Sequence, residues 1–441
     1  MPAIPVVDTK AKHNMKMNTI DGAFAAMSDN LSNPFLGLYA LSFGASLPQI
    51  GMLNAFPSLL GNLLQLPYGI LASKVANRKA LIAIGSLWNR FSWVLIAFLP
   101  FLVKPELSVS ILIILATLRI VGATLGVPAW IAIQAEIVPK NIRGRHYANR
   151  NMIMNAVALA AVLVAGKILL FRYPVNYQIL FILAWIAGLL SLRAFLKIIV
   201  EPAEKPAASQ NTNPEVSTNQ GAMRGFSLPY AVGAIRNNKD FAYYCFAFLV
   251  WSLGVNLISP LVPVYFIQNL HGTEAYWAYA QSAAIIGTIL CQRYWGRLTD
   301  VFGQKNIMVK AGLGAVLVPF WWFIAFNPLA AVGIQFWGGI MWGGYNLASF
   351  NLLLEVTPDD KRSLYVGIYN SLIGMATAAG HLVGGFLAEA IGMRYLFLIS
   401  FVGRILGLAL LSRVVDSSNL LMRWKDLGYP FMRGSRSLHS K

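Results

Sequence analysis

The sequence predicts an all-α polytopic membrane protein with twelve transmembrane helices, arranged as two six-helix bundles that repeat one another in parallel. Three observations lead to this fold class. The composition is 57% hydrophobic and only 12% charged, whereas soluble domains carry roughly 25% charged residues. Apolar runs of the length that crosses a bilayer, about 20 residues, recur along nearly the whole chain. A polar hinge in the second half also has a counterpart in the first half, which is typical of a duplicated architecture.

The hinge in the second half runs from Gly296 to Lys305, with Gly303 where the chain turns. Its counterpart in the first half begins at Gly69, so the offset between the two hinges is 296 − 69 = 227. The matched pairs are Gly69 with Gly296, Ser73 with Asp300, and Arg78 with Lys305. The acidic residue of the second hinge is therefore replaced by a serine in the first.

Another pair of hinges repeats at a slightly different offset, 355 − 136 = 219. Both have the spacing Glu-x-x-Pro-x-x-x-Arg. The matched pairs are Glu136 with Glu355, Pro139 with Pro358, and Arg143 with Arg362. Two halves in the same orientation, joined by a linker, predict the parallel repeat of a two-bundle transporter.

The predicted helices are apolar runs bounded by short polar hinges. Their ranges are 20–44, 47–73, 79–103, 107–138, 148–171, 176–199, 241–268, 273–297, 305–326, 329–356, 362–389 and 393–415. The stretch between the sixth and seventh helices is rich in Pro, Asn, Ser and Thr in its first part, so we predict a flexible linker there. Its more apolar part, 226–235, is a candidate interfacial helix. The predicted division is an N-terminal segment (1–19), an N-terminal bundle (20–200), a linker (201–240), a C-terminal bundle (241–415) and a basic tail (416–441).

Lysine and arginine residues gather in alternate hinges, on the side that also carries the two ends of the chain and the linker. Because cytoplasmic loops carry the excess of these residues, we expect both termini to be cytoplasmic and the protein to lie in the cytoplasmic (inner) membrane. The net charge of +18 is spread over these hinges and forms no single basic face, which argues against a nucleic-acid partner. We expect no cleaved signal peptide.

The remaining composition argues against several classes of chemistry. Two cysteines lie in apolar runs, and no Cys/His cluster has the spacing of a metal site. The sequence has no Gly-x-x-x-x-Gly-Lys-Ser/Thr motif, so ATP is not expected to be the direct energy source. We therefore predict a protein that is not an enzyme and that needs no cofactor and no metal.

The two kinds of hinge, the central linker and the repeat together make the chain resemble the major facilitator superfamily over essentially its whole length. Two departures argue against the two subfamilies with the clearest motifs. The fifth helix lacks the Gly-Pro motif of drug/proton antiporters, and the sugar-porter motif at the end of the sixth helix is absent. The resemblance implies that the first, fourth, seventh and tenth helices line a central cavity, with the second, fifth, eighth and eleventh between the bundles. It also implies that the two bundles rock about a site near the middle of the membrane.

The fourth predicted helix has a polar face in the part that should lie at mid-membrane. Arg119, Trp130 and Gln134 share it with Gly122 and Gly126, at steps of three or four residues. An arginine at this depth costs at least about 2.5 kcal/mol unless it is paired or hydrated. Arg119 is either an anion ligand or one partner of an ion pair inside the bundle.

The first predicted helix carries Asp29 and Asn33, followed by Pro34. Asp29 is a candidate proton carrier or counter-ion of Arg119, and the alternative is a position in a wetter vestibule. The Asn33–Pro34 step is expected to break the helix and free backbone groups near the site. Two further deep cations, Arg90 and Arg404, are expected to be structural, yet the excess of deep cations favours an anionic or zwitterionic solute.

In the second half, polar and aromatic residues again share helical faces. The candidates for the cavity are Trp251 and Asn256 on the seventh helix and Trp342 and Asn346 on the tenth. Each could equally make hydrogen bonds between helices, worth roughly 0.6 kcal/mol in membranes. His381 on the eleventh helix is a candidate proton relay, with a structural, hydrogen-bonded histidine as the alternative.

The hinge residues are predicted to form gates rather than to bind solute. The resemblance implies that Asp300 locks the bundles together at the cytoplasmic side, with the start of the fifth helix near Arg150 and Asn151 as its partner. The full set of predicted gate residues is Gly69, Ser73, Arg78, Gly296, Asp300, Gly303, Lys305, Glu136, Arg143, Glu355 and Arg362.

Two functions from different classes fit the sequence. The first is a monomeric secondary transporter that moves a small solute, anionic or zwitterionic, across the lipid bilayer by alternating access, with protons as a possible coupling ion. The second is a facilitator-like membrane protein that does not transport and acts as a receptor or assembly factor. A filled cavity should abolish the first function and spare the second.

Overall fold

The structure is a computed structural model that describes residues 8–75, 77–139, 142–200, 236, 238–357 and 362–413. For Leu66, Ala135 and 362–364 it describes the backbone alone. The candidate interfacial helix at 226–235, the basic tail at 416–441 and nearly all of the predicted linker lie outside the described residues. The described chain is helical, with no strand in these ranges.

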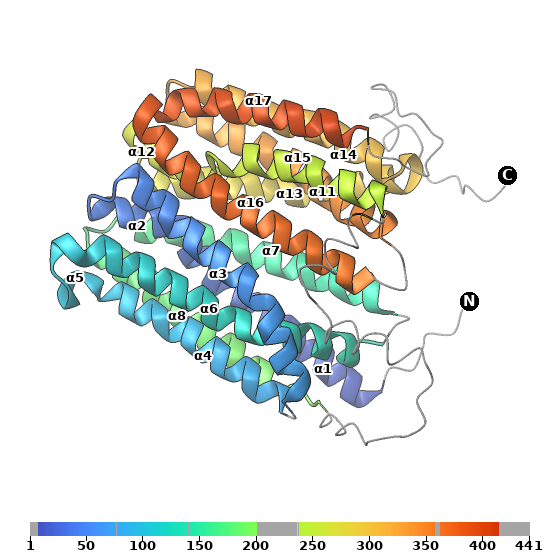
Figure 1. The fold of residues 1–441 in the computed structure, drawn as a ribbon. Helices are drawn as coiled ribbons and strands as arrows, with labels where there is room; N and C mark the ends of the chain where they lie inside the picture. The colour runs from blue at the N-terminus through green and yellow to red at the C-terminus, as the bar shows by residue number, and fades with distance from the viewer. Residues whose placement is uncertain are drawn as a thin grey trace.

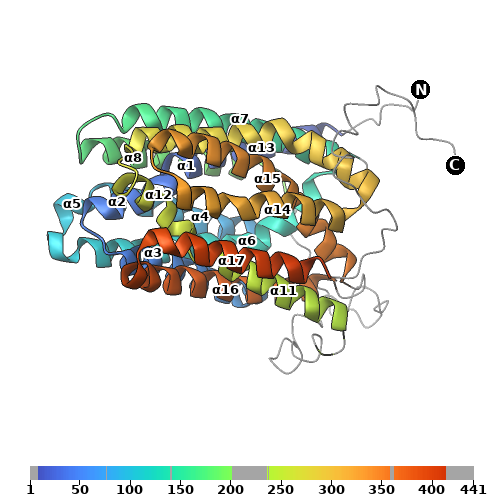
Figure 2. The ribbon, with the colours of Figure 1, turned by 90° about the horizontal axis from the view of Figure 1, so that it is seen from above.

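The N-terminal half forms the first bundle, whose helices lie roughly parallel to one another in Figures 1 and 2. Its elements are α1 (Thr9–Ser32), the 3-10 turn η1 (Asn33–Phe35), α2 (Leu36–Ser42), α3 (Leu47–Lys74), α4 (Arg78–Ala97), α5 (Leu99–Leu102), α6 (Pro105–Ile137), α7 (Arg143–Ile168) and α8 (Val175–Leu196).

The C-terminal half forms the second bundle beside the first (Figure 1). Its elements are α11 (Lys239–Asn256), the 3-10 turn η3 (Ser259–Leu261), α12 (Val262–Gln268), α13 (Glu274–Phe302), α14 (Gln304–Ile324), α15 (Pro328–Glu355), α16 (Arg362–Ile391) and α17 (Met393–Leu411).

Helices occupy all twelve predicted ranges. Eight of the described spans are long and apolar enough, by length and composition, to cross a membrane. Those in the first, second, eighth and tenth predicted ranges fall outside this group, because α1, α3, α13 and α15 carry many of the polar residues. The all-helical membrane architecture is therefore confirmed. Length and composition identify eight of the twelve predicted spans as membrane-crossing helices.

The first helix begins at Thr9, well before the predicted start at residue 20. The reason is a set of hydrogen bonds to the end of the sixth span. The side-chain amide of Asn14 donates to the carbonyl of Ile199 and its oxygen accepts from the amide of Ile199, both at 2.8 Å. The polar start of the chain thus folds as helix because the segment after α8 satisfies its side chains.

The predicted break at Asn33–Pro34 is confirmed, since α1 ends at Ser32 and a 3-10 turn follows. The second half breaks in the same place. The range 33–35 shifted by 227 gives 260–262, and the second 3-10 turn covers Ser259–Leu261. Both first spans of the two halves are therefore discontinuous near the same depth.

The repeat extends to the local structures that start and end helices. Ser46 and Thr273, which are matched by the first offset, both cap the following helix with their side-chain oxygens. In the second-half hinge, Gly303 has φ +80°, a left-handed conformation that glycine adopts without a steric cost. The predicted turn at Gly303 is confirmed.

The two bundles meet most closely at the end of the molecule opposite the linker. We call this end the far end; it carries the 42–47, 168–175 and 268–274 connections. The other end, where α1 and α11 begin and α8 and α17 end (Figure 1), is the linker end. At the far end, α3 lies against α16 and α7 lies against α13. A Cβ on Gly51 would lie 2.6 Å from the carbonyl oxygen of His381, and one on Gly166 would lie 3.0 Å from Ala278.

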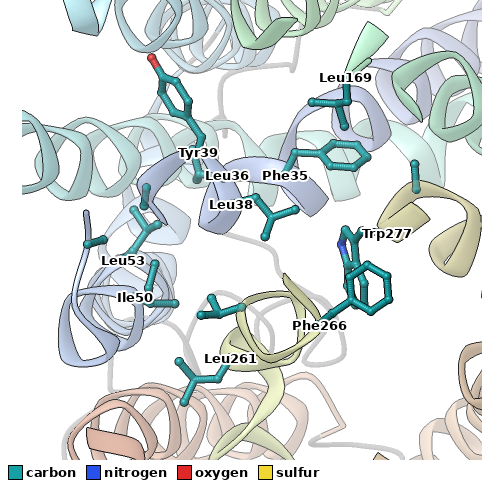
Figure 3. Packing of buried hydrophobic residues seen from close by; sticks show 14 of the residues in the cluster. Phe35, Leu36, Leu38, Tyr39, Ile50, Leu53, Leu169, Leu261, Phe266 and Trp277 are labelled. Carbon is teal, nitrogen blue, oxygen red and sulfur yellow. The ribbon is translucent and has the colours of Figure 1, made fainter. Parts of the chain in front are cut away.

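A shared hydrophobic cluster seals the far end. Figure 3 shows side chains from η1, α2 and α3, such as Phe35 and Ile50, near side chains from η3, α12 and α13, such as Leu261 and Trp277. All four side chains are at most 3% exposed. The two halves therefore share one buried core at this end.

Candidate functional site

The deepest charged group of the N-terminal bundle is Arg119 on α6. Its residue is 5% exposed, and its guanidinium lies over the indole of Trp93, with Cζ 4.3 Å from the ring centroid. An Nη donates to the side-chain oxygen of Asn33 at 3.0 Å, while Nε has no partner. The break after α1 thus presents Asn33 to Arg119, and the two predicted cavity residues are in contact.

Asp29 pairs with Arg90 rather than directly with Arg119. The Arg90 Nη1 lies 3.7 Å from the Asp29 carboxylate and also donates to the Ser28 hydroxyl at 3.1 Å. The Asp29 side chain is 51% exposed, which fits the predicted alternative of a wetter position. Arg119 and Asp29 still interact through space.

Arg90 is a functional candidate that the sequence had indicated to be structural. It lines both cavities found inside the N-terminal bundle, and its Nε is buried without a partner. The available signal was the polar spacing of Ser86, Asn89 and Arg90 on one face of the third helix. The prediction followed the resemblance instead, which places that helix on the outside of the bundle.

Two adjoining cavities, which we call the chamber, lie between α1, α4, α6, α7 and α8. Their volumes are about 290 Å³ and 190 Å³, and both are lined by Ile82, Ser86, Arg90 and Trp130. The larger one adds Asp21 and Arg150, among others. The predicted cavity residue Trp130 is therefore at a cavity, inside one bundle rather than between two.

The chamber is charged on two sides. The Ser191 hydroxyl donates to Asp21 at 2.6 Å, and the Asp21 carboxylate interacts through space with Arg150 and Arg90. Arg150 Nε donates to the carbonyl of Asn18 at 3.2 Å, and its guanidinium lies near the indole of Trp130, 5.8 Å from the ring centroid. Arg150 was predicted as a partner of Asp300, but in this structure it points into its own bundle.

Gln134 connects helices instead of lining the chamber. It is 5% exposed, and its amide donates to the side chain of Asn18 at 3.0 Å. The Tyr147 hydroxyl donates to the side-chain oxygen of Gln134 at 3.1 Å. These bonds join α6, α1 and α7 beside the chamber, a structural role for a residue predicted to face solute.

In the C-terminal bundle, the predicted aromatic residues pack against one another. Trp251 is 1% exposed and stacks on Tyr345, with ring centroids 4.7 Å apart. Trp342 meets Tyr345 edge-on at 5.5 Å, and Arg404 lies 5.8 Å from the Trp342 ring. Trp251 thus belongs to the core in this structure, because Gly407 lets α17 approach its backbone closely.

The polar candidates of this bundle satisfy each other. The Asn256 amide donates to the carbonyl of Ser252 at 2.8 Å, and its oxygen lies 3.1 Å from His381 Nε2. His381 Nε2 donates to the Asn256 oxygen in the tautomer that carries its proton on Nε2. His381 and Asn256 therefore form the inter-helix hydrogen bond that was the structural alternative, whereas Asn346 is exposed.

The gate residues lie at the linker end. Arg78 and Glu136 make an ion pair at 2.7 Å within the N-terminal bundle. The Asp300 carboxylate is exposed and has no ion-pair or hydrogen-bond partner among the described residues. The Arg143 guanidinium donates to the carbonyl of Val138 at 3.2 Å. The Ser73 hydroxyl bonds its own helix, and the side chain of Arg362 lies outside the described set.

A bond at the far end joins the bundles and was not anticipated. The Tyr177 hydroxyl on α8 donates to the Glu274 carboxylate at the start of α13, at 2.5 Å. Glu274 follows the helix cap Thr273, and its position in the first turn of a helix was the only signal in the sequence. This bond between the two bundles thus lies at the opposite end from the predicted latch.

Within the described ranges, no group of three or more His, Cys, Asp or Glu side chains could hold a metal ion. The arrangement offers guanidinium and indole groups that can bind a ligand.

Comparison with known proteins gives the chain its relatives. A family model described as Major Facilitator Superfamily matches residues 22–291 and 241–421. The multi-drug resistance efflux pump PmrA of Streptococcus pneumoniae is 30% identical over 167 residues, 35% of this chain and 39% of that protein. The Staphyloferrin B transporter of Staphylococcus aureus is 28% identical over 162 residues, 35% of this chain and 38% of that protein. The chain thus matches about two fifths of the length of these curated relatives.

Solved structures agree with the fold. A POT family transporter in complex with 5-aminolevulinic acid superimposes with a TM-score of 0.69 at 13% identity, over 91% of this chain and 96% of that one. The nucleoside transporter NupG gives a TM-score of 0.64 at 13% identity, over 91% and 98% of the two chains. At this identity the likeness establishes the fold alone.

Proposed function

The chain belongs to the Major Facilitator Superfamily, and from this premise we propose that it is a secondary transporter of a small anionic or zwitterionic solute. The solute crosses by alternating access of the two bundles. We place the protein in the cytoplasmic membrane as a monomer, with both termini cytoplasmic, because lysine and arginine are concentrated at the linker end.

The observation that carries the proposed solute class is the charge inside the N-terminal bundle. Three arginines, Arg90, Arg119 and Arg150, lie there with two carboxylates, Asp21 and Asp29. Ionisable groups at membrane depth are costly and usually mark substrate or ion pathways. An excess of one cation, beside unpartnered guanidinium nitrogens on Arg90 and Arg119, favours a ligand that brings a negative charge.

The packing of the bundles supports alternating access. The far end is closed by the shared hydrophobic cluster and by the Tyr177–Glu274 bond. At the linker end, Asp300 has no described partner and Arg150 points into the first bundle. A second conformation in which Asp300 meets the start of α7 completes the cycle. Asp29, half exposed and 3.7 Å from Arg90, is the proposed site of proton coupling, because a carboxylate inside the bundle can be reached by water.

Solute flux in proteoliposomes tests the proposal. Solutes that stabilise the purified protein are first found by thermal shift among anionic, zwitterionic and cationic compounds, and each is then measured for uptake. Gly126→Trp should abolish flux, since a Cβ at Gly126 would already lie 3.0 Å from Ile82 and an indole would fill the chamber. If flux persists in a folded Gly126→Trp protein, transport through this site is refuted. If no solute is transported and another cellular function persists in that variant, the receptor alternative stands.

The solute class has its own test. Arg119→Ala should remove the stabilisation by anions, and Arg119→Lys, which keeps the charge without the planar stacking on Trp93, should restore part of it. Anionic solutes that stabilise Arg119→Ala as strongly as the unmodified protein would overturn the anionic part of the proposal and leave transport itself untouched.

A further inference from the structure

We propose that the chamber binds a small carboxylic acid with an apolar body, its carboxylate held by Arg90 and Arg150 and its body by Trp130. This inference rests on the proposed function, since the bound acid would be the transported solute. It assigns the binding to a recess within one bundle, not to the contact between the two bundles.

The chamber has room for a molecule and not only for an ion. Ligand pockets in proteins have volumes of roughly 300–1,000 Å³, and the two adjoining spaces of about 290 Å³ and 190 Å³ together fall in the lower part of that range. Gly126 lines the smaller space. Its missing side chain lets α6 pass in contact with the α4 backbone, since a Cβ there would lie 3.0 Å from Cα of Ile82.

Both arginines have donors to spare at this space. Arg90 uses Nη1 on Ser28 and Asp29, while its buried Nε has no partner. Arg150 uses Nε on the carbonyl of Asn18, which leaves its terminal nitrogens for a ligand. Guanidinium groups match the planar geometry of a carboxylate with two parallel hydrogen bonds, so two of them beside one recess point to that group.

The walls between the charges are apolar. The larger space is bounded by Ile82, Met154, Leu192 and Phe195, with the indole of Trp130 shared by both spaces. Large aromatic and aliphatic side chains of this kind hold the body of a ligand while a few polar groups set its orientation. A flat, apolar acid fits this division better than an inorganic oxyanion, which would leave these walls facing water.

Asp21 limits the charge of the ligand. Its carboxylate accepts from Ser191 and interacts with both arginines, and Asp29 lies 3.7 Å from Arg90, so the two carboxylates leave one of the bundle's three deep arginines unbalanced. A monoanion completes the neutralisation, whereas a dianion would be repelled by Asp21 and an organic cation by the two guanidinium groups. The chemistry therefore selects a single carboxylate.

The C-terminal bundle has aromatic side chains at the positions equivalent to the chamber residues. Shifting the chamber residues by the repeat offsets places Gly126 on Tyr345, Arg150 on Tyr369 and Asp21 on Phe248. In that bundle Phe248 and Tyr369 meet edge-on with centroids 5.3 Å apart, and Tyr345 lies 6.2 Å from Phe248. Three rings occupy the equivalent positions, so an empty, charged recess is not required by the fold.

Calorimetry on the full-length protein in detergent tests the inference with benzoate as the probe. Benzamide is the neutral isostere and benzylammonium the cationic one. Benzoate should bind, and Arg150→Gln should weaken it about tenfold or more, the usual effect of losing a charge-assisted hydrogen bond. Trp130→Leu should weaken it about fivefold through the loss of the aromatic face. Arg193→Gln, an exposed arginine on α8, is the matched control and should bind as the unmodified protein does.

Equal affinity of benzoate for the unmodified protein and for Arg150→Gln and Arg90→Gln would overturn the chamber site, as would equal binding of benzamide and benzoate. Preference for inorganic phosphate or sulfate over benzoate would overturn the apolar-body assignment. Circular dichroism and gel filtration show whether a variant is folded, and Arg150→Lys replaces Arg150→Gln if it is not. Benzoate binding at the chamber with no flux of benzoate in proteoliposomes would refute the transport proposal and leave the site standing.

Discussion

The interiors of the two bundles differ at the positions that the repeat makes equivalent. At these positions the N-terminal bundle holds charges beside a chamber, and the C-terminal bundle holds rings and neutral side chains. The deep arginine of the C-terminal bundle, Arg404, matches Trp185 instead. The equivalent pairs are Asp21 with Phe248, Asp29 with Asn256, Arg90 with Leu317, Arg119 with Gly338, and Arg150 with Tyr369. All five charged positions of the first bundle are uncharged in the second.

A glycine at equivalent positions in the two halves lets another helix approach closely in each bundle. Gly188 on α8 and Gly407 on α17 are matched by the second repeat offset. A Cβ on Gly188 would lie 2.2 Å from Cδ of Arg90, and one on Gly407 would lie 2.5 Å from Cα of Trp251. The same close approach makes room for a cation in one bundle and for an aromatic residue in the other.

The difference teaches that the charges are not demanded by the architecture. Burying an ion costs several kcal/mol even in a pair, and well-packed hydrophobic residues often replace buried ion pairs without loss of stability. The C-terminal bundle is such a replacement made within one chain. The charges kept in the N-terminal bundle are therefore best explained by binding, and the C-terminal bundle by support and movement.

The largest expected effect separates the deep arginines of the two bundles. Arg119→Met should lower the free energy of unfolding by about 2–4 kcal/mol, because it removes the contact with Trp93 and leaves the side-chain oxygen of Asn33 without its donor. Arg404→Met should change it by less than about 1 kcal/mol, since Arg404 has no carboxylate partner among the described residues and donates only to the carbonyl of Ala315. Thermal unfolding in detergent measures both, and equal losses in the two variants would erase the contrast between the bundles.

A smaller effect is expected at the bond that joins the bundles. Tyr177→Phe removes the hydroxyl that donates to Glu274 and should cost the far-end contact about 1–2 kcal/mol, a shift of roughly 5–30-fold in the balance of conformations. Spin-label distances across the far end should lengthen in a larger fraction of molecules. Tyr173→Phe, at an exposed neighbouring ring, is the control, and an unchanged distance distribution in Tyr177→Phe would remove this bond from the gating scheme.

The smallest effect concerns the linker-end hinges. Exchanging the two hinge residues, Ser73→Asp with Asp300→Ser, should keep the fold and alter the balance of conformations by about 0.3–1 kcal/mol, the usual size of a carboxylate interaction at a helix end. Cysteine labelling at the linker end reports the change. Identical labelling rates in the exchanged and unmodified proteins would show that Asp300 is no latch.

The helices and the repeat could be predicted from the sequence because both depend on hydropathy and on short local motifs. Gly303, the break at Asn33–Pro34 and the helix caps Ser46 and Thr273 are determined by a few neighbouring residues. The start of α1 was predicted too late in the chain because Asn14 becomes helical through hydrogen bonds to Ile199, a distant residue that a local pattern does not contain.

The site was harder to predict, since it depends on which of several polar faces meet. Arg119 and Asn33 share a hydrogen bond as two candidates on cavity helices should, but the partner of Asp29 is Arg90, on a helix assigned to the outside. Trp251 and Gln134 have the spacing of cavity residues and are buried by contacts with Tyr345 and Asn18. The chamber itself is a space left between five packed helices, and a pattern of residue types does not show where space remains.

Flux of radiolabelled benzoate into proteoliposomes, compared between Arg150→Gln and Tyr369→Phe, tests the central contrast most directly. The two positions are equivalent under the repeat, one in each bundle. The account predicts that benzoate uptake falls about tenfold or more in Arg150→Gln and stays within about twofold of the unmodified protein in Tyr369→Phe, since a neutral ring keeps its packing. Equal losses in the two variants, or full uptake by Arg150→Gln, would contradict the account that the N-terminal bundle binds the solute and the C-terminal bundle supports it.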